Sequence, residues 1–308
     1  MSTTSSNSTE RRLTSDVVIG IPAYNEADTV GDVVRAASAP DVDVVVVDDG
    51  SDDSTAAVAS DAGATVLQHG DNRGYGAALG TLFSAAHDSG VDHLVVVDAD
   101  GQHDPTEALS LVEAQRSTGG DIVIGSRFVE GSQTDMPLYR RAGLGVINGL
   151  TGAALALGYS ANAVADTQSG FRAYNAEAIE LLACRADLSD GMDASLDILF
   201  HAADEEFTFT ETPVDVTYDV AEANTHNPVV HGAVLVSNIF GRALSDRPGR
   251  VLGVPGSICL VLGGLLTSVS LTGLTLAVVP VLVAVLVLTG SGLLGAALAI
   301  GRLRPSRE

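Results

Sequence analysis

Short apolar runs alternate with amphipathic segments over the first 125 residues of the chain. Five runs rich in valine and isoleucine have the length of strands buried on both faces, and segments with helical spacing of apolar residues lie between them. The predicted strands cover residues 16–22, 42–47, 64–68, 93–97 and 121–125. Strands that alternate with helices predict an α/β fold with a doubly wound, mostly parallel sheet.

Polar side chains directly follow three of these strands. Residues 22–26 read Pro-Ala-Tyr-Asn-Glu, residues 48–51 read Asp-Asp-Gly-Ser, and residues 98–102 read Asp-Ala-Asp-Gly-Gln. Because the carboxyl ends of parallel strands meet at one edge of a sheet, we expect these segments to line one cleft. Asp98 and Asp100 carry the oxygen ligands that Mg²⁺ or Mn²⁺ prefers, and such an ion would let an acidic cleft hold a diphosphate.

The Asp98/Asp100 pair also has a plainer interpretation. Among 39 acidic residues an Asp-x-Asp sequence arises by chance, and residues 41–43 form a second copy with no evident site. Within residues 16–225 neither a Gly-x-Gly-x-x-Gly loop nor a Gly-Lys-Ser/Thr loop occurs, so this part of the sequence lacks the phosphate loops of dinucleotide-binding and kinase-like proteins.

The charge balance concerns the solvent more than the substrate. The 16 basic residues are all arginine, against 39 acidic ones, which gives a formal net charge of −23. In multimolar salt the Debye length is about 3 Å or less, so an acidic surface repels itself little. We therefore expect a salt-accumulating halophile as the source and no nucleic-acid partner. Cys184 and Cys259 stand alone, which favours free thiols.

The carboxyl-terminal region predicts a membrane anchor. Residues 251–301 include no charged residue, which suffices for two spans of about 20 residues each, divided near Thr272 and Gly273. Arginines flank this stretch on both sides and the turn is uncharged, so both termini and the amino-terminal domain are expected in the cytoplasm. A buried pair of helices is the alternative. Residues 144–158 are too short to span, which leaves an interfacial helix or a core helix.

These patterns predict five consecutive segments. They are a disordered tail (1–15), a cytoplasmic domain (16–225), a juxtamembrane amphipathic segment (226–248), two transmembrane helices (249–301) and a cytoplasmic tail (302–308).

Six motifs together resemble the inverting family 2 glycosyltransferases of the dolichyl-phosphate mannose or glucose synthase type. They lie in the family's order within residues 16–218, at 22–26, 48–51, 72–76, 98–103, 125–128 and 166–172. The resemblance implies a GT-A fold and metal-dependent transfer of a hexose from a nucleotide-diphosphate sugar (UDP-glucose or GDP-mannose) to polyprenyl (dolichyl) phosphate. It also implies a role in S-layer type protein N-glycosylation, expected in an archaeal halophile.

The resemblance assigns roles in donor binding. The implied nucleotide-sugar residues are Pro22, Tyr24, Glu26, Val47, Asp49, Asp98, Ala99, Asp100, Ser169 and Gly170. Glu26 would take the ribose hydroxyls, Asp49 the base or the ribose, and Ser169 with Gly170 would border the sugar.

The resemblance likewise implies the metal and acceptor residues. Asp98, Asp100 and Gln102 would hold Mg²⁺ or Mn²⁺, and Arg127 with Arg140 or Arg141 would grip the lipid phosphate. The catalytic set is then Asp98, Asp100 and Arg127. A structural ion pair is the alternative for Arg127. The acceptor phosphate is already anionic near neutral pH, so no strong general base is needed.

The chain departs from the family near residues 218–227, where acidic and neutral residues replace basic ones, and at Asp193, where a lysine is common. His226, Asn227 and His231 are possible substitutes. The histidines at 69, 87, 93 and 201 are expected to lie at the surface or in packing, and His103 to support the metal motif.

Three alternatives remain beside the main interpretation. The acceptor could be a lipid-linked oligosaccharide or a glycolipid, or the chain could be a non-catalytic nucleotide-sugar-binding membrane protein. A processive polysaccharide synthase is disfavoured, because the chain has no tryptophan for a Gln-x-x-Arg-Trp motif. Small residues at 263, 264 and 268 could support a homo-oligomer of the hairpin.

Overall fold

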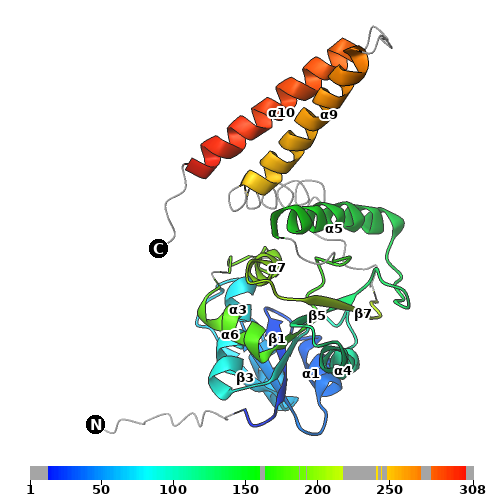
Figure 1. Cartoon of the computed structure of the whole chain (residues 1–308). Helices are drawn as coiled ribbons and strands as arrows, with labels where there is room; N and C mark the ends of the chain where they lie inside the picture. Colours follow the sequence, from blue (N-terminus) through cyan, green and yellow to red (C-terminus); the bar gives the residue numbers. More distant parts are fainter. Residues whose placement is uncertain are drawn as a thin grey trace. The chain divides into compact units, whose positions relative to one another are not determined.

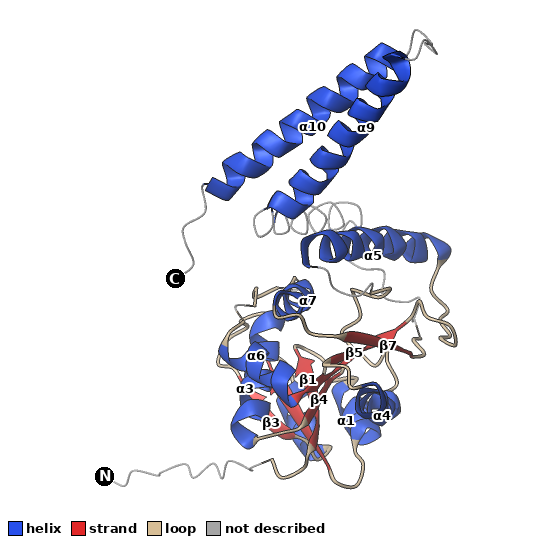
Figure 2. Ribbon diagram, viewed as in Figure 1, coloured by secondary structure: helices blue, strands red, loops and turns tan. Residues whose placement is uncertain are grey.

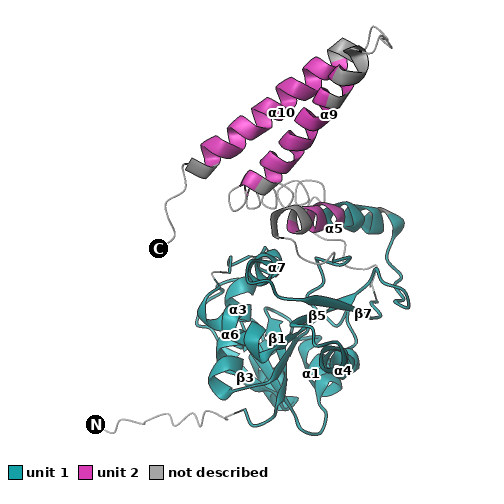
Figure 3. Ribbon diagram, viewed as in Figure 1, with its two compact units in different colours: residues 1–148, 164–225 teal, residues 149–163, 226–308 magenta. Residues whose placement is uncertain are grey.

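The computed structural model describes residues 13–159, 164–186, 188–191, 193–217, 241, 244, 248–271 and 279–302. The chain divides into two compact units, one with residues 1–148 and 164–225, the other with residues 149–163 and 226–308 (Figure 3). Most of the predicted amino-terminal tail, juxtamembrane segment and carboxyl-terminal tail, and the departure at 218–227, lie outside the described residues.

A seven-stranded sheet forms the centre of the first unit (Figure 1). Its strands, in spatial order, are β3 (Thr65–Gln68), β2 (Val42–Asp48), β1 (Val17–Ala23), β4 (His93–Val96), β6 (Arg172–Asn175), β5 (Ile122–Ser126) and β7 (Phe209–Pro213). Every neighbouring pair is parallel except those of β6, which runs antiparallel to β4 and β5. The predicted mostly parallel sheet is confirmed, and β1 to β5 are the five expected strands.

The sequence analysis did not identify β6 or β7. β6 has only four residues, Arg-Ala-Tyr-Asn, and lacks the apolar run that marked the other strands. It is a strand because both of its edges are paired, Ala173 facing Val95 on one side and Val123 on the other. This reversed strand enters the sheet at the edge where β4 and β5 end, so the segment before Arg172 reaches that edge as well.

Helices cover both faces of the sheet (Figure 2). The helices α1 (Val30–Ala37), α2 (Thr55–Asp61) and α4 (Ala108–Thr118), the last entered through a 3₁₀ turn at Pro105–Glu107, contribute to one apolar core. That core includes alternate residues of β1, Val17, Ile19 and Ile21, as expected when successive side chains of a strand point to opposite faces. The helices α3 (Tyr75–Ser89), α6 (Ala176–Cys184) and α7 (Ala194–Asp204) pack against one another, and α3 contacts β1 and β2.

The helix α5 (Leu138–Tyr159) includes the predicted helix at 144–158 and extends beyond it at its amino-terminal end. Residues 138–148 belong to the first unit. There the Asn148 side-chain oxygen accepts hydrogen bonds from the backbone N–H (3.1 Å) and the hydroxyl (2.8 Å) of Thr167. Leu138 and Val146 remain exposed. The anchored Asn148 and the exposed apolar residues leave both the interfacial and the core interpretation open.

The second unit includes two apolar helices, α9 (Val254–Leu271), preceded by a π-helical turn at Gly249–Gly253, and α10 (Val279–Arg302). They pack against each other where glycines meet: a methyl group on Gly290 would lie 2.7 Å from the Gly256 carbonyl oxygen. Gly263 also faces α10, since its Cβ would lie 3.0 Å from Val287. Among the described residues one helical stretch, Leu282–Ile300, is long and apolar enough to cross a membrane, with a mean hydropathy of 2.3. The second span stays a prediction.

The start of α3 lies directly against the backbone of residues 189–190. A Cβ on Gly76 would lie 1.8 Å from the Ser189 carbonyl oxygen, and the Gly76 N–H donates to the Asp190 carbonyl oxygen at 3.0 Å. Ser189 is itself held, because its N–H and hydroxyl both donate to Asp197. Gly80, one turn later, has no such neighbour within 4 Å.

We therefore expect Gly76→Ala and Gly80→Ala to change stability in opposite directions. Gly76→Ala must displace the held 189–190 backbone and should lower the unfolding free energy by roughly 1–3 kcal/mol, as overpacking does. Gly80→Ala should raise it by about 0.5–1 kcal/mol, because alanine favours helix. Thermal unfolding in high salt measures both. Equal effects of the two substitutions would contradict the close contact at Gly76.

Candidate functional site

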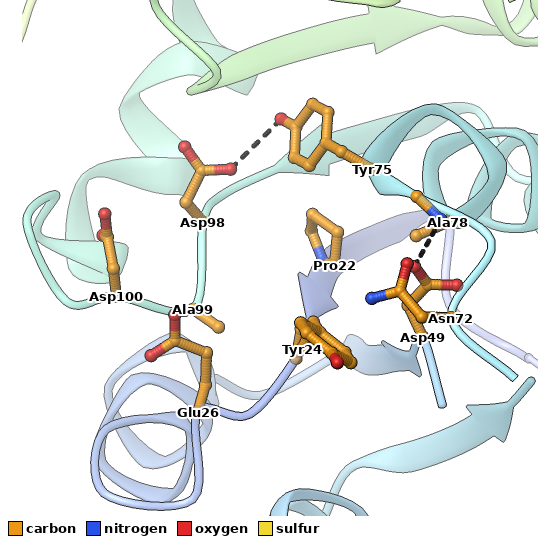
Figure 4. Close-up of a pocket in the computed structure, with 12 residues that line it drawn as sticks. Pro22, Tyr24, Glu26, Asp49, Asn72, Tyr75, Ala78, Asp98, Ala99 and Asp100 are labelled. Carbon is orange, nitrogen blue, oxygen red and sulfur yellow. Dashed lines mark hydrogen bonds between the residues drawn. The ribbon is translucent and has the colours of Figure 1, made fainter. Parts of the chain in front are cut away.

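A pocket of about 320 Å³ opens at the edge of the sheet where β1, β2 and β4 end (Figure 4). Its wall comes from those three strand ends and from the start of α3. The lining residues are Pro22, Ala23, Tyr24, Glu26, Asp49, Asn72, Gly74, Tyr75, Ala78, Asp98, Ala99 and Asp100. Parallel pairing of β1 with β2 and β4 brings these distant segments together, as the sequence predicted.

Two carboxylates, Asp98 and Asp100, lie together on one side of this pocket. The Tyr75 hydroxyl donates to Asp98 Oδ1 at 3.1 Å, and the Gln102 N–H donates to Asp100 Oδ1 at 2.9 Å. The backbone of Gly170 lies close to the other Asp98 oxygen, because a Cβ added to Gly170 would lie only 2.6 Å from Oδ2. The carboxylate of Asp98 is therefore fixed on one oxygen and crowded on the other.

The surroundings raise the pKa of Asp98 to about 6. Removal from water is the main cause and repulsion from Asp100 adds to it, while the Tyr75 hydrogen bond and the positive charges of Arg172 and Arg127 act in the opposite direction. A carboxylate whose charge is this costly gains most from a cation placed between it and its neighbour.

The donor set fits a divalent metal ion. Asp98 and Asp100 supply two carboxylates one residue apart, the hard ligands that Mg²⁺ and Mn²⁺ take. Gln102, the third predicted ligand, does not line the pocket, and its role as a ligand stays a prediction. The raised pKa of Asp98 follows from its removal from water and from the neighbouring charge of Asp100, both of which a bound cation would offset. Among the described residues, no group of three or more His, Cys, Asp or Glu side chains is placed so that it could hold a metal ion, so a site here relies on two carboxylates and other oxygen ligands.

On the other side of the pocket, Asp49 is held by three donors. The His69 ring nitrogen Nδ1 (2.5 Å) and the Arg73 N–H (3.0 Å) reach Oδ1, and the Gly74 N–H reaches Oδ2 at 2.7 Å. The second ring nitrogen of His69 contacts the Thr81 hydroxyl at 2.9 Å. His69 is thus buried, as one of the two expectations (surface or packing) had it, and it also orients Asp49.

The turn after β1 is fixed by the turn after β2. Asn25 has a positive φ of 56°, and its side-chain oxygen accepts from the Asp52 N–H at 2.9 Å. The Glu26 N–H donates to the Thr55 hydroxyl at 2.8 Å, and the Thr29 hydroxyl donates to Glu26 Oε2 at 3.0 Å. Glu26 thus keeps its carboxylate at the pocket while its backbone is anchored.

The structure brings most, but not all, of the predicted donor-site residues into the pocket wall. Seven line it: Pro22, Tyr24, Glu26, Asp49, Asp98, Ala99 and Asp100. Three do not: Val47 is buried in β2 beside Pro22, Gly170 lies behind Asp98, and the buried Ser169 precedes it. Among the residues that the structure describes, the buried Ser169 hydroxyl finds no hydrogen-bond partner.

Arg127 forms a buried ion pair with Asp166. Its Nε donates to Oδ2 at 2.7 Å, one terminal nitrogen donates to Oδ1 at 2.8 Å, and its backbone N–H adds a third bond at 3.0 Å. Asp166 is fully buried, and Arg127 is 9% exposed. This ion pair is the structural role that the sequence analysis gave as the alternative for Arg127. It uses two of the three guanidinium nitrogens as donors to Asp166. The phosphate role of Arg127 stays a prediction.

The other predicted phosphate ligands lie at the start of α5. The backbone N–H groups of Arg140 and Arg141 both donate to the Pro137 carbonyl oxygen at 3.0 Å. Arg141 is exposed and Arg140 half-buried. Neither lines the described pocket. The candidate substitutes His226, Asn227 and His231 lie outside the described residues.

Sequence reasoning missed the roles of Tyr75, His69 and Asp166. Tyr75 belongs to the quoted motif at 72–76, so its motif was a signal, but nothing in the sequence shows that its hydroxyl reaches Asp98. The partners of His69 and Asp166 lie 20 and 39 residues away in the chain. Only the folded sheet brings them together.

Comparison with known proteins assigns the chain that forms this pocket to a family. The sequence model of Glycosyl transferase family 2 matches residues 18–181. Polyprenol monophosphomannose synthase of Mycolicibacterium smegmatis is 32% identical over 67% of this chain and 79% of its own length. Dolichyl-phosphate hexose transferase of Haloferax volcanii is 29% identical over 75% of this chain and 96% of its own.

A solved structure shows the same fold. Glucosyl-3-phosphoglycerate synthase of Mycobacterium tuberculosis, crystallised with Mn²⁺, UDP and glucosyl-3-phosphoglycerate, superposes with a TM-score of 0.52. The alignment covers 75% of this chain and 79% of that one at 18% identity. At this identity the likeness establishes the fold, which is the predicted nucleotide-sugar transferase type.

The Arg127–Asp166 pair predicts a specific loss of stability. Asp166→Ala leaves the Arg127 guanidinium buried without its counter-charge and should cost about 3–5 kcal/mol. Asp32→Ala breaks the exposed Asp32–Arg35 pair and serves as the control, with no measurable change expected. Thermal unfolding in molar KCl compares them. If both variants melted like the wild type, the buried pair would be unimportant for the fold.

Proposed function

The chain belongs to glycosyl transferase family 2, and on that premise we propose that it transfers a hexose from a nucleotide-diphosphate sugar to polyprenyl (dolichyl) monophosphate, with inversion at the anomeric carbon. The observation that carries the proposal is the pocket at the ends of β1, β2 and β4 with Asp98 and Asp100 at one side. Similar proteins named as polyprenyl-phosphate and dolichyl-phosphate sugar transferases support the acceptor.

Different residues of the pocket are proposed to bind the base, the ribose and the diphosphate of the donor. Asp49 and Asn72 lie across the pocket from Asp98 and Asp100 in the view of Figure 4, with Pro22 and Tyr24 between them. A nucleotide that places its base near Asp49 and its ribose near Tyr24 and Glu26 directs its diphosphate toward the paired carboxylates.

A divalent cation bound by Asp98, Asp100 and Gln102 would neutralise charge on the leaving diphosphate. The chain's own contribution is to hold these oxygens: Tyr75 and Gly170 fix Asp98, and the Gln102 N–H fixes Asp100. The acceptor phosphate oxygen is the nucleophile and is already ionised near neutral pH, so catalysis consists of alignment and charge stabilisation.

The chain is proposed to work at the cytoplasmic side of the cell membrane and to supply lipid-linked sugar for protein glycosylation. Support comes from the apolar stretch Leu282–Ile300 and the arginines that follow it in the sequence. The absence of lysine and the net charge of −23 support a halophilic source, and relatives from Haloferax volcanii are among the similar proteins.

A transfer assay tests the proposal directly. Membranes containing the protein in molar KCl are given labelled UDP-glucose or GDP-mannose with dolichyl phosphate. We expect a mild-acid-labile lipid product that disappears with a chelator and returns with Mg²⁺ or Mn²⁺. Asp100→Ala should lower transfer by about 100-fold or more, because the metal supplies several kcal/mol of charge stabilisation.

The matched control is Asp61→Ala, an exposed carboxylate at the end of α2 outside the pocket, which should leave transfer unchanged. Donor hydrolysis or binding without lipid product would contradict the proposed acceptor and favour a glycolipid or lipid-linked oligosaccharide. Transfer that is insensitive to both chelator and Asp100→Ala would contradict the metal.

Gly170→Ala tests the metal site without catalysis. The new methyl group would lie 2.6 Å from Asp98 Oδ2, so the carboxylate must turn away. Mn²⁺ binding, measured by electron paramagnetic resonance, should weaken by about 10–100-fold, the usual effect of disturbing a ligand's support. Gly143→Ala, whose Cβ meets nothing within 4 Å, should bind Mn²⁺ like the wild type. Equal binding by both variants would exclude Asp98 as a ligand.

A further inference from the structure

The contacts of Asp49 bear on which nucleobase the pocket accepts. An ionised carboxylate offers about four acceptor positions, two on each oxygen. Three of the four positions of Asp49 are occupied: Oδ1 receives both the His69 ring and the Arg73 N–H, and Oδ2 receives the Gly74 N–H. One acceptor position remains, on Oδ2.

Uracil and guanine make different demands on such a carboxylate. Guanine presents two adjacent N–H donors on its pairing edge and matches a carboxylate with both oxygens open. Uracil presents one N–H between two carbonyl oxygens, so it matches a single open oxygen and is repelled by a second one. The Asn72 amide nearby donates and accepts equally well, so it suits either base.

We propose that Asp49, with Oδ1 saturated by His69 and Arg73, selects uracil, and that the donor is a uridine-diphosphate sugar. His69 is then a specificity-determining residue that acts through Asp49. The inference rests on the proposed function only in taking this pocket as the nucleotide site, and it names no acceptor.

The orientation of His69 is itself fixed. Because the carboxylate can only accept, the His69 nitrogen Nδ1 carries the proton. The other ring nitrogen meets Thr81 Oγ1 on α3 at 2.9 Å, and the side chains of His69 and Asp49 are 7% and 4% exposed. Water cannot readily replace a donor held between two such partners. Removing the ring therefore frees the acceptor position on Oδ1 that His69 occupies.

Nucleotide binding without acceptor tests the inference. The full-length protein in molar KCl with MgCl₂ is titrated calorimetrically with UDP and with GDP. We expect UDP to bind at least about tenfold more tightly, the worth of one hydrogen bond that is made rather than left unpaired. In His69→Leu, which keeps the volume but removes the donor, GDP should bind more tightly and UDP more weakly, so that the ratio falls about tenfold or more.

Two further variants separate specificity from simple damage. Thr81→Val leaves His69 in place but removes its second contact, and should shift the ratio in the same direction by less. His93→Leu is the control. His93 begins β4, at the end of the strand away from the pocket, and its ring contacts Gln115, so this substitution should leave the ratio unchanged. Equal weakening of both nucleotides in His69→Leu, or tighter GDP binding by the wild type, would overturn the inference. Selective UDP binding without lipid-linked product would instead contradict only the proposed acceptor.

Discussion

Burying carboxylates at one edge of a sheet is the constraint on which this structure depends. Asp48, Asp49 and Asp166 are each no more than 3% exposed, and each is supplied with hydrogen-bond donors from other elements. Asp98 is the exception, with one hydroxyl donor and the like charge of Asp100 beside it. A cation bound beside Asp98 would offset both the removal of this carboxylate from water and its repulsion by Asp100.

Much of this arrangement follows from local sequence. Runs such as Val44–Val47 specify buried strands whatever surrounds them, and parallel pairing then places Glu26, Asp49 and Asp98 at one edge. Fold class could therefore be predicted from the hydrophobic pattern, and the general position of the pocket from the polar segments that follow the strands.

The partners of the polar side chains could not be predicted in that way. Arg127 finds Asp166 only because the reversed strand β6 returns the chain between β4 and β5, and β6 has too few apolar residues to be recognised. His69 was expected to lie at the surface or in packing, because its partner Asp49 lies 20 residues away in the chain. Which donor satisfies which carboxylate depends on tertiary contacts across 20 or more residues, and the sequence shows only that the candidates exist.

The Arg127–Asp166 pair affects which parts of the sequence can tolerate substitution. It joins two residues 39 positions apart, at the points where the chain leaves β5 and returns toward β6. The segment between them forms an excursion from the sheet that includes α5. The Arg127–Asp166 ion pair holds the two ends of this excursion together beside the sheet. Substitutions at exposed positions of this excursion, such as Leu138 and Val146, leave the Arg127–Asp166 pair and the donor pocket untouched. The fold thereby separates the donor pocket from a segment whose exposed positions can diversify.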